Sequence, residues 1–240
     1  MTTSVRTIYE HKQRTRLKIK IAALAVLLFS AGGAFAYLNW WEHVFEFKEV
    51  VLEGVSSLSQ GELLGGAGPV SFFSSVRISH PAVAGVVLHR DYFRRVLRIE
   101  VEERERFGIW CVASCFWFDK EGALFAEAPR AEGALVRRVS DRTGRELSLG
   151  GRALPPERMV QLLRAFELLT RAGFGAGEAV VEDLSKEEVY IELLEGPRVI
   201  FSLRNDPTFA YEPLLNLKGE LPKIAYIDLR VEQRIFLKYK

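Results

Sequence analysis

A run of 21 residues without a charged side chain, IAALAVLLFSAGGAFAYLNWW at positions 21–41, constrains the fold of this chain more than any other stretch. At about 1.5 Å per residue, an α-helix of this length measures roughly 32 Å. The hydrocarbon core of a bilayer is about 30 Å thick. The run therefore predicts a transmembrane helix over residues 21–41.

The residues on either side of this run predict its orientation. Residues 1–20 carry six Lys and Arg side chains against the single acid Glu10, and such a basic tail favours the cytoplasmic side. Tyr37, Trp40 and Trp41 gather at the opposite end, where aromatic rings suit the headgroup region. We therefore expect a cytoplasmic tail (1–20) and a single-pass protein of the cytoplasmic membrane with its bulk outside the cytoplasm.

The alternative is a secretory signal that is removed. Residues 34–36 (Ala-Phe-Ala) have the small-x-small pattern that signal peptidase accepts. Both interpretations place residues 42–240 in the same compartment, outside the cytoplasmic membrane.

The charge distribution argues against nucleic acid as a partner. The whole chain has a formal net charge of +2. Residues 1–41 hold six basic residues and one acid, so the remaining 199 residues carry a formal charge of −3. A nucleic-acid-binding domain normally shows the opposite sign.

Cys111 and Cys115 are the only cysteines, in the stretch WCVASCFW. A three-residue gap can close a hairpin, and an oxidising compartment permits a disulfide across it. Two reduced, half-buried strand cysteines are the alternative. A metal site is not expected, because no histidine lies nearby to complete a tetrahedral set of ligands.

Residues 45–105 predict a small domain in the order strand, helix, helix, strand, strand. The first strand is FEFKEVVLEGV (45–55). Ser59 can cap a short helix over 59–68, and a second short helix is expected from Pro69 through Val76. Two extended runs follow, over 82–93 and 96–103.

Residues 106–240 predict a mixed α/β domain with a largely antiparallel sheet. Its clearest helix is PERMVQLLRAFELLTRAG, in which the apolar residues share one stripe. The remaining expected elements are strands at 107–111, 115–119 and 123–127, a hairpin of 189–195 with 198–203, a helix over 208–217 and a terminal strand. The expected fold class of the whole chain is therefore α+β.

The terminal run IAYIDLRVEQRIFLKYK (224–240) alternates between apolar and polar residues. A single strand of this length exceeds the usual three to ten residues, so a reversal is expected near 232–234. A three-residue loop keeps the apolar face intact and gives the pairs Val231/Ile235, Leu229/Leu237, Ile227/Tyr239 and Asp228/Lys238. No Gly or Asn is present for the left-handed position that such loops prefer, so one long bent strand is the alternative.

The last strand, about 234–239, is expected at an open edge of the sheet, because no further sequence follows to cover it. Open edges expose unpaired backbone N–H and C=O groups, which recruit a partner strand or aggregate. We expect recruitment.

Several stretches taken together resemble one family. A short basic tail, one apolar segment, VVLEGVSSLSQGELL, VLRIEVEERERFGIW and IAYIDLR follow one another in the order seen in the FtsQ/DivIB proteins of the bacterial division machinery. The resemblance covers nearly the whole chain, and residues 226–230 (YIDLR) are its most specific part. One departure is Arg106, where the family often has a proline.

This resemblance implies a fold and a function. It implies a POTRA-like domain over 45–105, a family-specific β domain over 106–240, and a non-enzymatic scaffold at the division septum. The partners implied are the FtsB (or DivIC) and FtsL complex, bound by strand addition at the carboxy-terminal edge, and other division proteins bound through the POTRA-like domain. The partner-binding positions implied are Arg230, Val231, Gln233, Ile235 and Phe236. Phe236, an apolar residue on the polar face, is the strongest candidate, with an incidental exposed aromatic as its alternative.

Motifs of other protein classes are incomplete. His89-Arg90-Asp91 resembles the start of a kinase catalytic loop, but Val96 stands where a metal-binding asparagine is needed. Residues 65–68 (GGAG) lack the Lys-Ser/Thr of a phosphate loop. We expect neither catalysis nor a cofactor. The alternative roles are a POTRA-bearing assembly factor, or a hydrolase released after signal cleavage.

Overall fold

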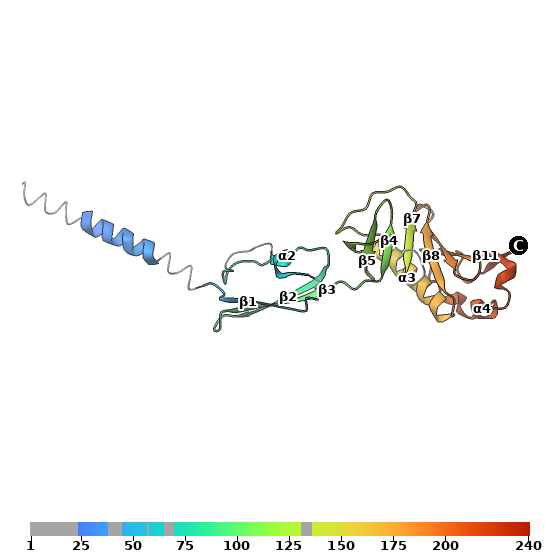
Figure 1. Ribbon diagram of the computed structural model, residues 1–240, viewed down its shortest axis with the longest axis horizontal. Coiled ribbons are helices and arrows are strands. Elements are labelled where there is room, and N and C mark those ends of the chain that lie inside the picture. Colours follow the sequence, from blue (N-terminus) through green and yellow to red (C-terminus); the bar gives the residue numbers. More distant parts are fainter. Residues whose placement is uncertain (1–23, 38–44, 57, 65–69, 131–135) are drawn as a thin grey trace, which may run out of the picture. The chain divides into compact units, whose positions relative to one another are not determined.

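The computed structural model of the chain describes residues 24–37, 45–56, 58–64, 70–130 and 136–240 (Figure 1). The chain divides into two compact units. One comprises residues 1–51, 65–77 and 88–99, and the other comprises 52–64, 78–87 and 100–240. The strands form two separate sheets, one of three strands and one of nine.

Residues 24–37 form a helix with exposed side chains, drawn in blue in Figure 1. Its 14 residues measure roughly 21 Å at about 1.5 Å per residue. Within the described part of the chain, no helix is long and apolar enough to cross a membrane. The expected fold class included a transmembrane helix over residues 21–41, and this part of the prediction is wrong for the described residues 24–37. Residues 21–23 and 38–41 of that prediction, and the tail 1–20, lie outside the described residues.

The three-stranded sheet has the order β1-β3-β2. Its strands are β1 (Glu49–Glu53), β2 (Val83–Asp91) and β3 (Val96–Glu103), and α2 (Gln60–Leu64) follows β1 in the chain. In β3 the side chains of Leu97, Ile99 and Val101 are buried while those between them point outward, as alternation predicts. Ser59 and Glu62 form the expected cap of α2, with the Ser59 N–H donating to Glu62 Oε2 at 2.7 Å.

The prediction of a second helix over residues 69–76 is wrong for the described part of this segment, residues 70–76. This segment forms an isolated β-bridge at Ser71 and a turn over residues 71–74, because its backbone bonds to the residues before β1. The Phe47 N–H donates to the Val70 carbonyl at 2.9 Å, and the Phe72 N–H donates to the Phe45 carbonyl at 2.7 Å. Tertiary pairing therefore replaces the weak local preference for a helix.

The nine-stranded sheet has the order β12-β11-β10-β9-β8-β7-β4-β5-β6. It is mixed, because β4/β7, β7/β8 and β10/β11 pair in parallel and the other five neighbouring pairs are antiparallel. The expectation of a largely antiparallel sheet is corrected to this mixed topology. The strands are β4 (Gly108–Cys111), β5 (Cys115–Phe118), β6 (Leu124–Glu127), β7 (Arg138–Asp141), β8 (Ala176–Val181), β9 (Glu188–Leu193), β10 (Arg198–Ser202), β11 (Ile224–Leu229) and β12 (Phe236–Tyr239).

The parallel pairs follow from the connections between strands. Parallel neighbours need a crossover, because a tight turn joins only antiparallel strands. Helix α3 (Pro156–Arg171) connects β7 to β8, and the helices η1 (Pro207–Ala210), α4 (Tyr211–Asn216) and η2 (Leu221–Lys223) connect β10 to β11. Figure 1 shows α3 lying along the sheet.

A large apolar core joins the sheet to these helices. The predicted stripe of α3 is confirmed, with Met159, Leu162, Phe166 and Leu169 buried. They belong to one cluster with apolar residues of β4 to β11, η1 and α4. This core holds β9, β10 and β11 as a rigid support for the strand at the end of the sheet.

Cys111 and Cys115 face each other across the β4/β5 hairpin and are joined by a disulfide. The sequence left open whether these cysteines are reduced or disulfide-bonded, and in the structure they are disulfide-bonded. Both residues are buried beside Ile109. A disulfide of this kind is typical of proteins that mature outside the reducing cytoplasm.

Removing this disulfide is expected to lower the free energy of unfolding by about 2 kcal/mol, because the loop that it closes is only five residues long. The measurement is urea denaturation of the wild-type protein with and without reductant. The C111A/C115A variant is the control, and its unfolding midpoint should not respond to reductant. A wild-type midpoint that is insensitive to reductant would contradict the prediction.

Candidate protein-binding edge of the large sheet

Strand β11 builds the edge from an alternating sequence. Ile227 and Leu229 are buried in the core, while Tyr226 and Asp228 lie on the opposite face and are half-buried. A register irregularity lies between Ile224 and Tyr226, where Ile224 is in the core and Ala225 is only partly buried. A β-bulge of this kind moves side chains between faces over one step.

Strand β12 reverses direction and pairs antiparallel with β11. Leu237 lies opposite Ile227, and Phe236 lies opposite Asp228. The expected reversal is confirmed, but the expected pairs are wrong by two residues, because they placed Leu237 opposite Leu229. A shift by two residues keeps each side chain on its face, so Leu237 still packs against the core and Phe236 still lies on the other face.

The connection between the two strands, residues 230–235, is longer than the expected three-residue loop. It turns at residues 231–234, where the Arg234 N–H donates to the Val231 carbonyl at 3.1 Å. Gln233 takes the left-handed conformation with φ +58°. A residue with a Cβ pays roughly 1–2 kcal/mol for this conformation, so the surrounding contacts must hold the loop in place.

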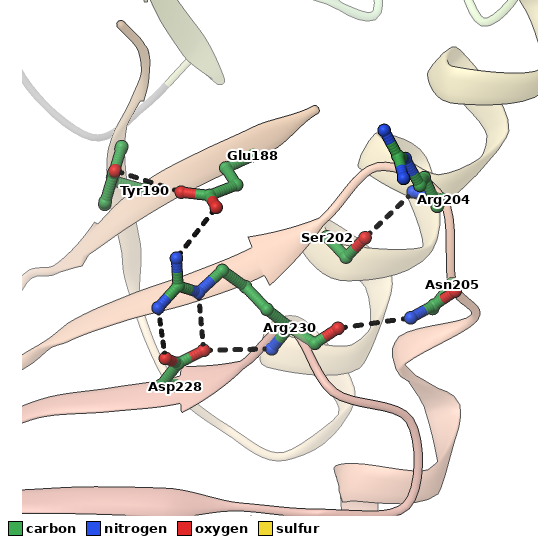
Figure 2. A network of polar contacts seen from close by, with 7 residues as sticks. All are labelled: Glu188, Tyr190, Ser202, Arg204, Asn205, Asp228 and Arg230. Atoms are coloured by element: carbon green, nitrogen blue, oxygen red, sulfur yellow. Dashed lines mark hydrogen bonds and ion pairs between the residues drawn. The ribbon is translucent and has the colours of Figure 1, made fainter. Parts of the chain in front are cut away.

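Arg230 supplies those contacts at the start of the loop (Figure 2). Its Nε and Nη2 atoms donate to the two carboxylate oxygens of Asp228 at 2.9 and 2.6 Å, and its Nη1 atom donates to Glu188 Oε1 at 2.7 Å. Its carbonyl accepts from Asn205 Nδ2 at 3.1 Å. Three separate segments thereby hold the point at which the chain leaves β11.

The ion pair of Asp228 and Arg230 stays charged over a wide pH range. Burial by itself raises the pKa of Asp228, but the hydrogen bonds from the side chain and backbone of Arg230 outweigh it, so the pKa lies below its ordinary value. The pKa of Arg230 is raised by its hydrogen bonds to Asp228 and Glu188. The loop is therefore held in one state around neutral pH.

Strand β12 is the last strand of the sheet and pairs with β11 on one side only, within the described residues. Just after it, the Lys240 N–H donates to the Lys223 carbonyl at 3.0 Å. Successive residues of a strand direct their backbone groups to opposite sides. The backbone groups of Leu237 and Tyr239 therefore point away from β11.

The opposite end of the sheet is built differently. Strand β6 receives backbone hydrogen bonds from a loop, in which the Leu124 N–H donates to the Gly151 carbonyl at 2.9 Å and the Gly150 N–H donates to the Leu124 carbonyl at 2.7 Å. Ala123 and Arg152 form an isolated antiparallel bridge beside them. The chain thus covers part of this edge itself, as proteins commonly do.

The five residues expected to bind a partner all lie at this edge, but they differ in exposure and in their contacts with the rest of the chain. Val231, Gln233 and Phe236 are exposed, and Phe236 shows 48% of its surface. Ile235 is partly buried and packs against the core. Arg230 is exposed in part, but its guanidinium is engaged with Asp228 and Glu188, so its role here is to position the loop.

Sequence reasoning did not single out Leu237, Lys238 and Tyr239 as site residues. Tyr239 is 52% exposed, and Lys238 lies over the Tyr226 ring with Nζ 5.7 Å from its centroid. The alternating pattern shows that every second residue of this strand directs its backbone groups outward. Which residues these are depends on the register of β12 against β11, and only the structure shows that register.

In the part of the chain that the structure describes, no group of three or more His, Cys, Asp or Glu side chains is arranged to hold a metal ion. A search of protein-family models and of curated proteins finds no match to this chain.

Proposed function

We propose that this chain is a non-enzymatic scaffold of the bacterial division machinery that binds the FtsB (or DivIC) and FtsL complex by β-strand addition to β12. One observation supports this mechanism: among the described residues, β12 is the last strand of the nine-stranded sheet and pairs with β11 on one side only, which leaves the backbone groups on its other side for a partner strand. The resemblance of YIDLR and the preceding stretches to FtsQ/DivIB proteins supplies the identity of the partner.

Strand addition needs an edge that is ordered before the partner arrives, because ordering a flexible strand consumes binding free energy. Here the Arg230 network holds the loop, and Leu237 ties β12 to the core. Backbone hydrogen bonds to the incoming strand supply affinity, and neighbouring side chains supply specificity. Phe236 and Tyr239 are the large exposed apolar side chains of β12, and aromatic residues often dominate binding energy at interfaces.

The proposed place of action is the division septum, on the outer side of the cytoplasmic membrane. The disulfide between Cys111 and Cys115 supports a compartment outside the cytoplasm. A fluorescently tagged full-length copy should form rings at mid-cell. Uniform staining of the envelope would favour an assembly factor or a hydrolase instead.

Replacing Phe236 by glutamate is expected to weaken binding of the FtsB–FtsL complex by at least about tenfold, because the change removes an exposed aromatic contact and adds a charge opposite Asp228. The measurement is co-purification and titration with the FtsB–FtsL complex of the same bacterium. The matched control is Leu149→Glu, because Leu149 is 42% exposed in the loop beside the other edge. Full binding by the Phe236 variant, or equal loss in both variants, would overturn the proposal.

A further inference from the structure

The turn between β2 and β3 holds large apolar side chains out in solvent. Phe93 at its tip is fully exposed, and Tyr92 is 50% exposed. The turn is ordered, since Asp91 Oδ1 accepts a hydrogen bond from the Arg94 N–H at 2.9 Å and Arg95 takes a left-handed conformation with φ +57°. The exposure of Phe93 is thus built into the backbone.

An aromatic cluster extends this apolar surface from the tip. The Tyr92 ring packs against Phe72 and Phe47 with centroids 5.2 and 6.1 Å apart, and Phe45 packs against Phe73 at 5.7 Å. Phe73 is 80% exposed. Apolar groups held outward in this way mark a surface that meets another apolar phase or partner.

Basic side chains surround the same tip. Residues 88–98 contain four arginines and one aspartate, a formal charge of +3 without the histidine. Arg90, Arg94 and Arg98 line an open groove of about 680 Å³ on this sheet. The acids of the groove are Glu49 and Asp91, and the side chains of Asp91 and Arg94 form a long ion pair at 3.9 Å. The balance of charge favours an anionic occupant.

The segment that precedes the small sheet in the sequence includes an apolar helix. The backbone N–H of Lys48 donates to the Arg95 carbonyl at 2.8 Å, so the chain enters the small sheet beside the turn. The exposed apolar helix 24–37 precedes this entry in the sequence. Exposed Leu, Val and Phe side chains cover that helix, and such a surface has affinity for lipid.

We propose that the β2–β3 turn is a lipid-binding tip, in which Phe93, Tyr92 and Phe73 enter the headgroup region of an anionic bilayer while Arg90, Arg94 and Arg98 bind lipid phosphates. Exposed aromatic side chains flanked by arginines are the combination that inserts at a membrane interface. The inference does not depend on strand addition at β12.

The test measures hydrogen exchange of residues 90–96 in full-length protein reconstituted into vesicles. Vesicles of phosphatidylcholine and phosphatidylglycerol at about 3:1 are compared with vesicles of phosphatidylcholine alone. Each arginine near an anionic surface contributes roughly a fivefold change in binding, so we expect exchange to be at least about fivefold slower on anionic vesicles. High salt should restore fast exchange.

The F93S/R94S variant should lose this protection, and its fold should survive because both side chains are exposed, with Arg94 at 84%. Unchanged exchange in β3 verifies that fold, and loop 142–150 in the same sample is the control for general shielding. Three results would overturn the proposal: equal exchange on both vesicle types, equal protection in detergent micelles, or protection that persists in the variant. The last would indicate a contact between protein copies. None of these bears on β12, because the vesicles contain no partner protein.

Discussion

Replacing Asp141 by alanine is expected to lower the free energy of unfolding by about 3 kcal/mol, because two buried or half-buried donors lose their acceptor. Asp141 ends β7, and its Oδ2 atom accepts from Trp110 Nε1 at 3.1 Å and from Arg145 Nε at 2.7 Å. Its Oδ1 atom accepts from the backbone and hydroxyl of Thr143 at 3.1 and 2.6 Å. Trp110 is wholly buried, so its N–H loses its acceptor in the interior of the protein.

Urea denaturation followed by fluorescence measures this change, and an unaltered slope would show that the loss lies in the folded state. The matched control is Asp183→Ala. Asp183 makes the same local bonds, to the backbone and hydroxyl of Ser185 at 2.8 and 2.7 Å, but on the surface. The Asp183→Ala variant should lower the free energy of unfolding by much less than Asp141→Ala does. Equal losses of stability in the two variants would contradict the importance of the buried network around Asp141.

The contribution of Asp141 should also depend on pH. Burial by itself raises the pKa of Asp141, but hydrogen bonds from Thr143 and Arg145 outweigh it and hold the pKa below its ordinary value. A carboxylate with a lowered pKa in the folded state adds stability above the pKa of the unfolded state, near 3.9, and loses it as the pH falls. The difference between wild type and Asp141→Ala should therefore be constant near neutral pH and shrink below about pH 4.

Replacing Tyr239 by proline should abolish most binding of the FtsB–FtsL complex, by at least about tenfold, while the fold persists. Proline is tolerated where a strand directs its N–H outward, and the outward N–H of Tyr239 is the group that an added strand needs. The loss leaves a carbonyl of the partner without its donor and adds a ring in its path.

Two control variants separate the backbone from the side chain. Tyr239→Ala keeps the N–H and should bind more tightly than Tyr239→Pro. Lys238→Pro removes an N–H that faces β11 and should destabilise the sheet edge itself, which thermal unfolding measures. If Tyr239→Pro and Tyr239→Ala bound the complex equally, strand addition at this edge would be excluded.

Sequence patterns predicted the elements whose burial is strictly periodic. Helix α3 follows from its apolar stripe between proline and glycine, and alternation predicts the buried residues of β3 and, within β11, Ile227 and Leu229. The reversal after β11 also follows, because 17 alternating residues are too many for one strand. In each case the sequence signal is local, because the polarity of a side chain indicates whether it faces the core or the solvent.

The corrected features depend on residues far apart in the chain. Residues 70–76 form no helix because the backbone of Phe45 and Phe47 bonds to them, and β7 is parallel to β4 and β8 because crossovers join them. The transmembrane helix of the expected fold class is a separate case, because it was inferred from the length of the uncharged run 21–41 and its flanking residues, and the described helix over residues 24–37 is too short for it.

At the candidate site, the alternation of residues 226–229 by itself determined that Ile227 and Leu229 face the core while Tyr226 and Asp228 face away, because that depends only on the two-residue period of a strand. The β-bulge near Ala225 and the turn that exposes Val231 interrupt this period, and the sequence did not reveal either. Tertiary structure alone decided the register of β12, the left-handed turn at Gln233 and the capture of Arg230 by Asp228 and Glu188. The reason is physical: a backbone amide faces a neighbour or an open edge according to how strands align across the sheet, and that alignment minimises the free energy of the whole core.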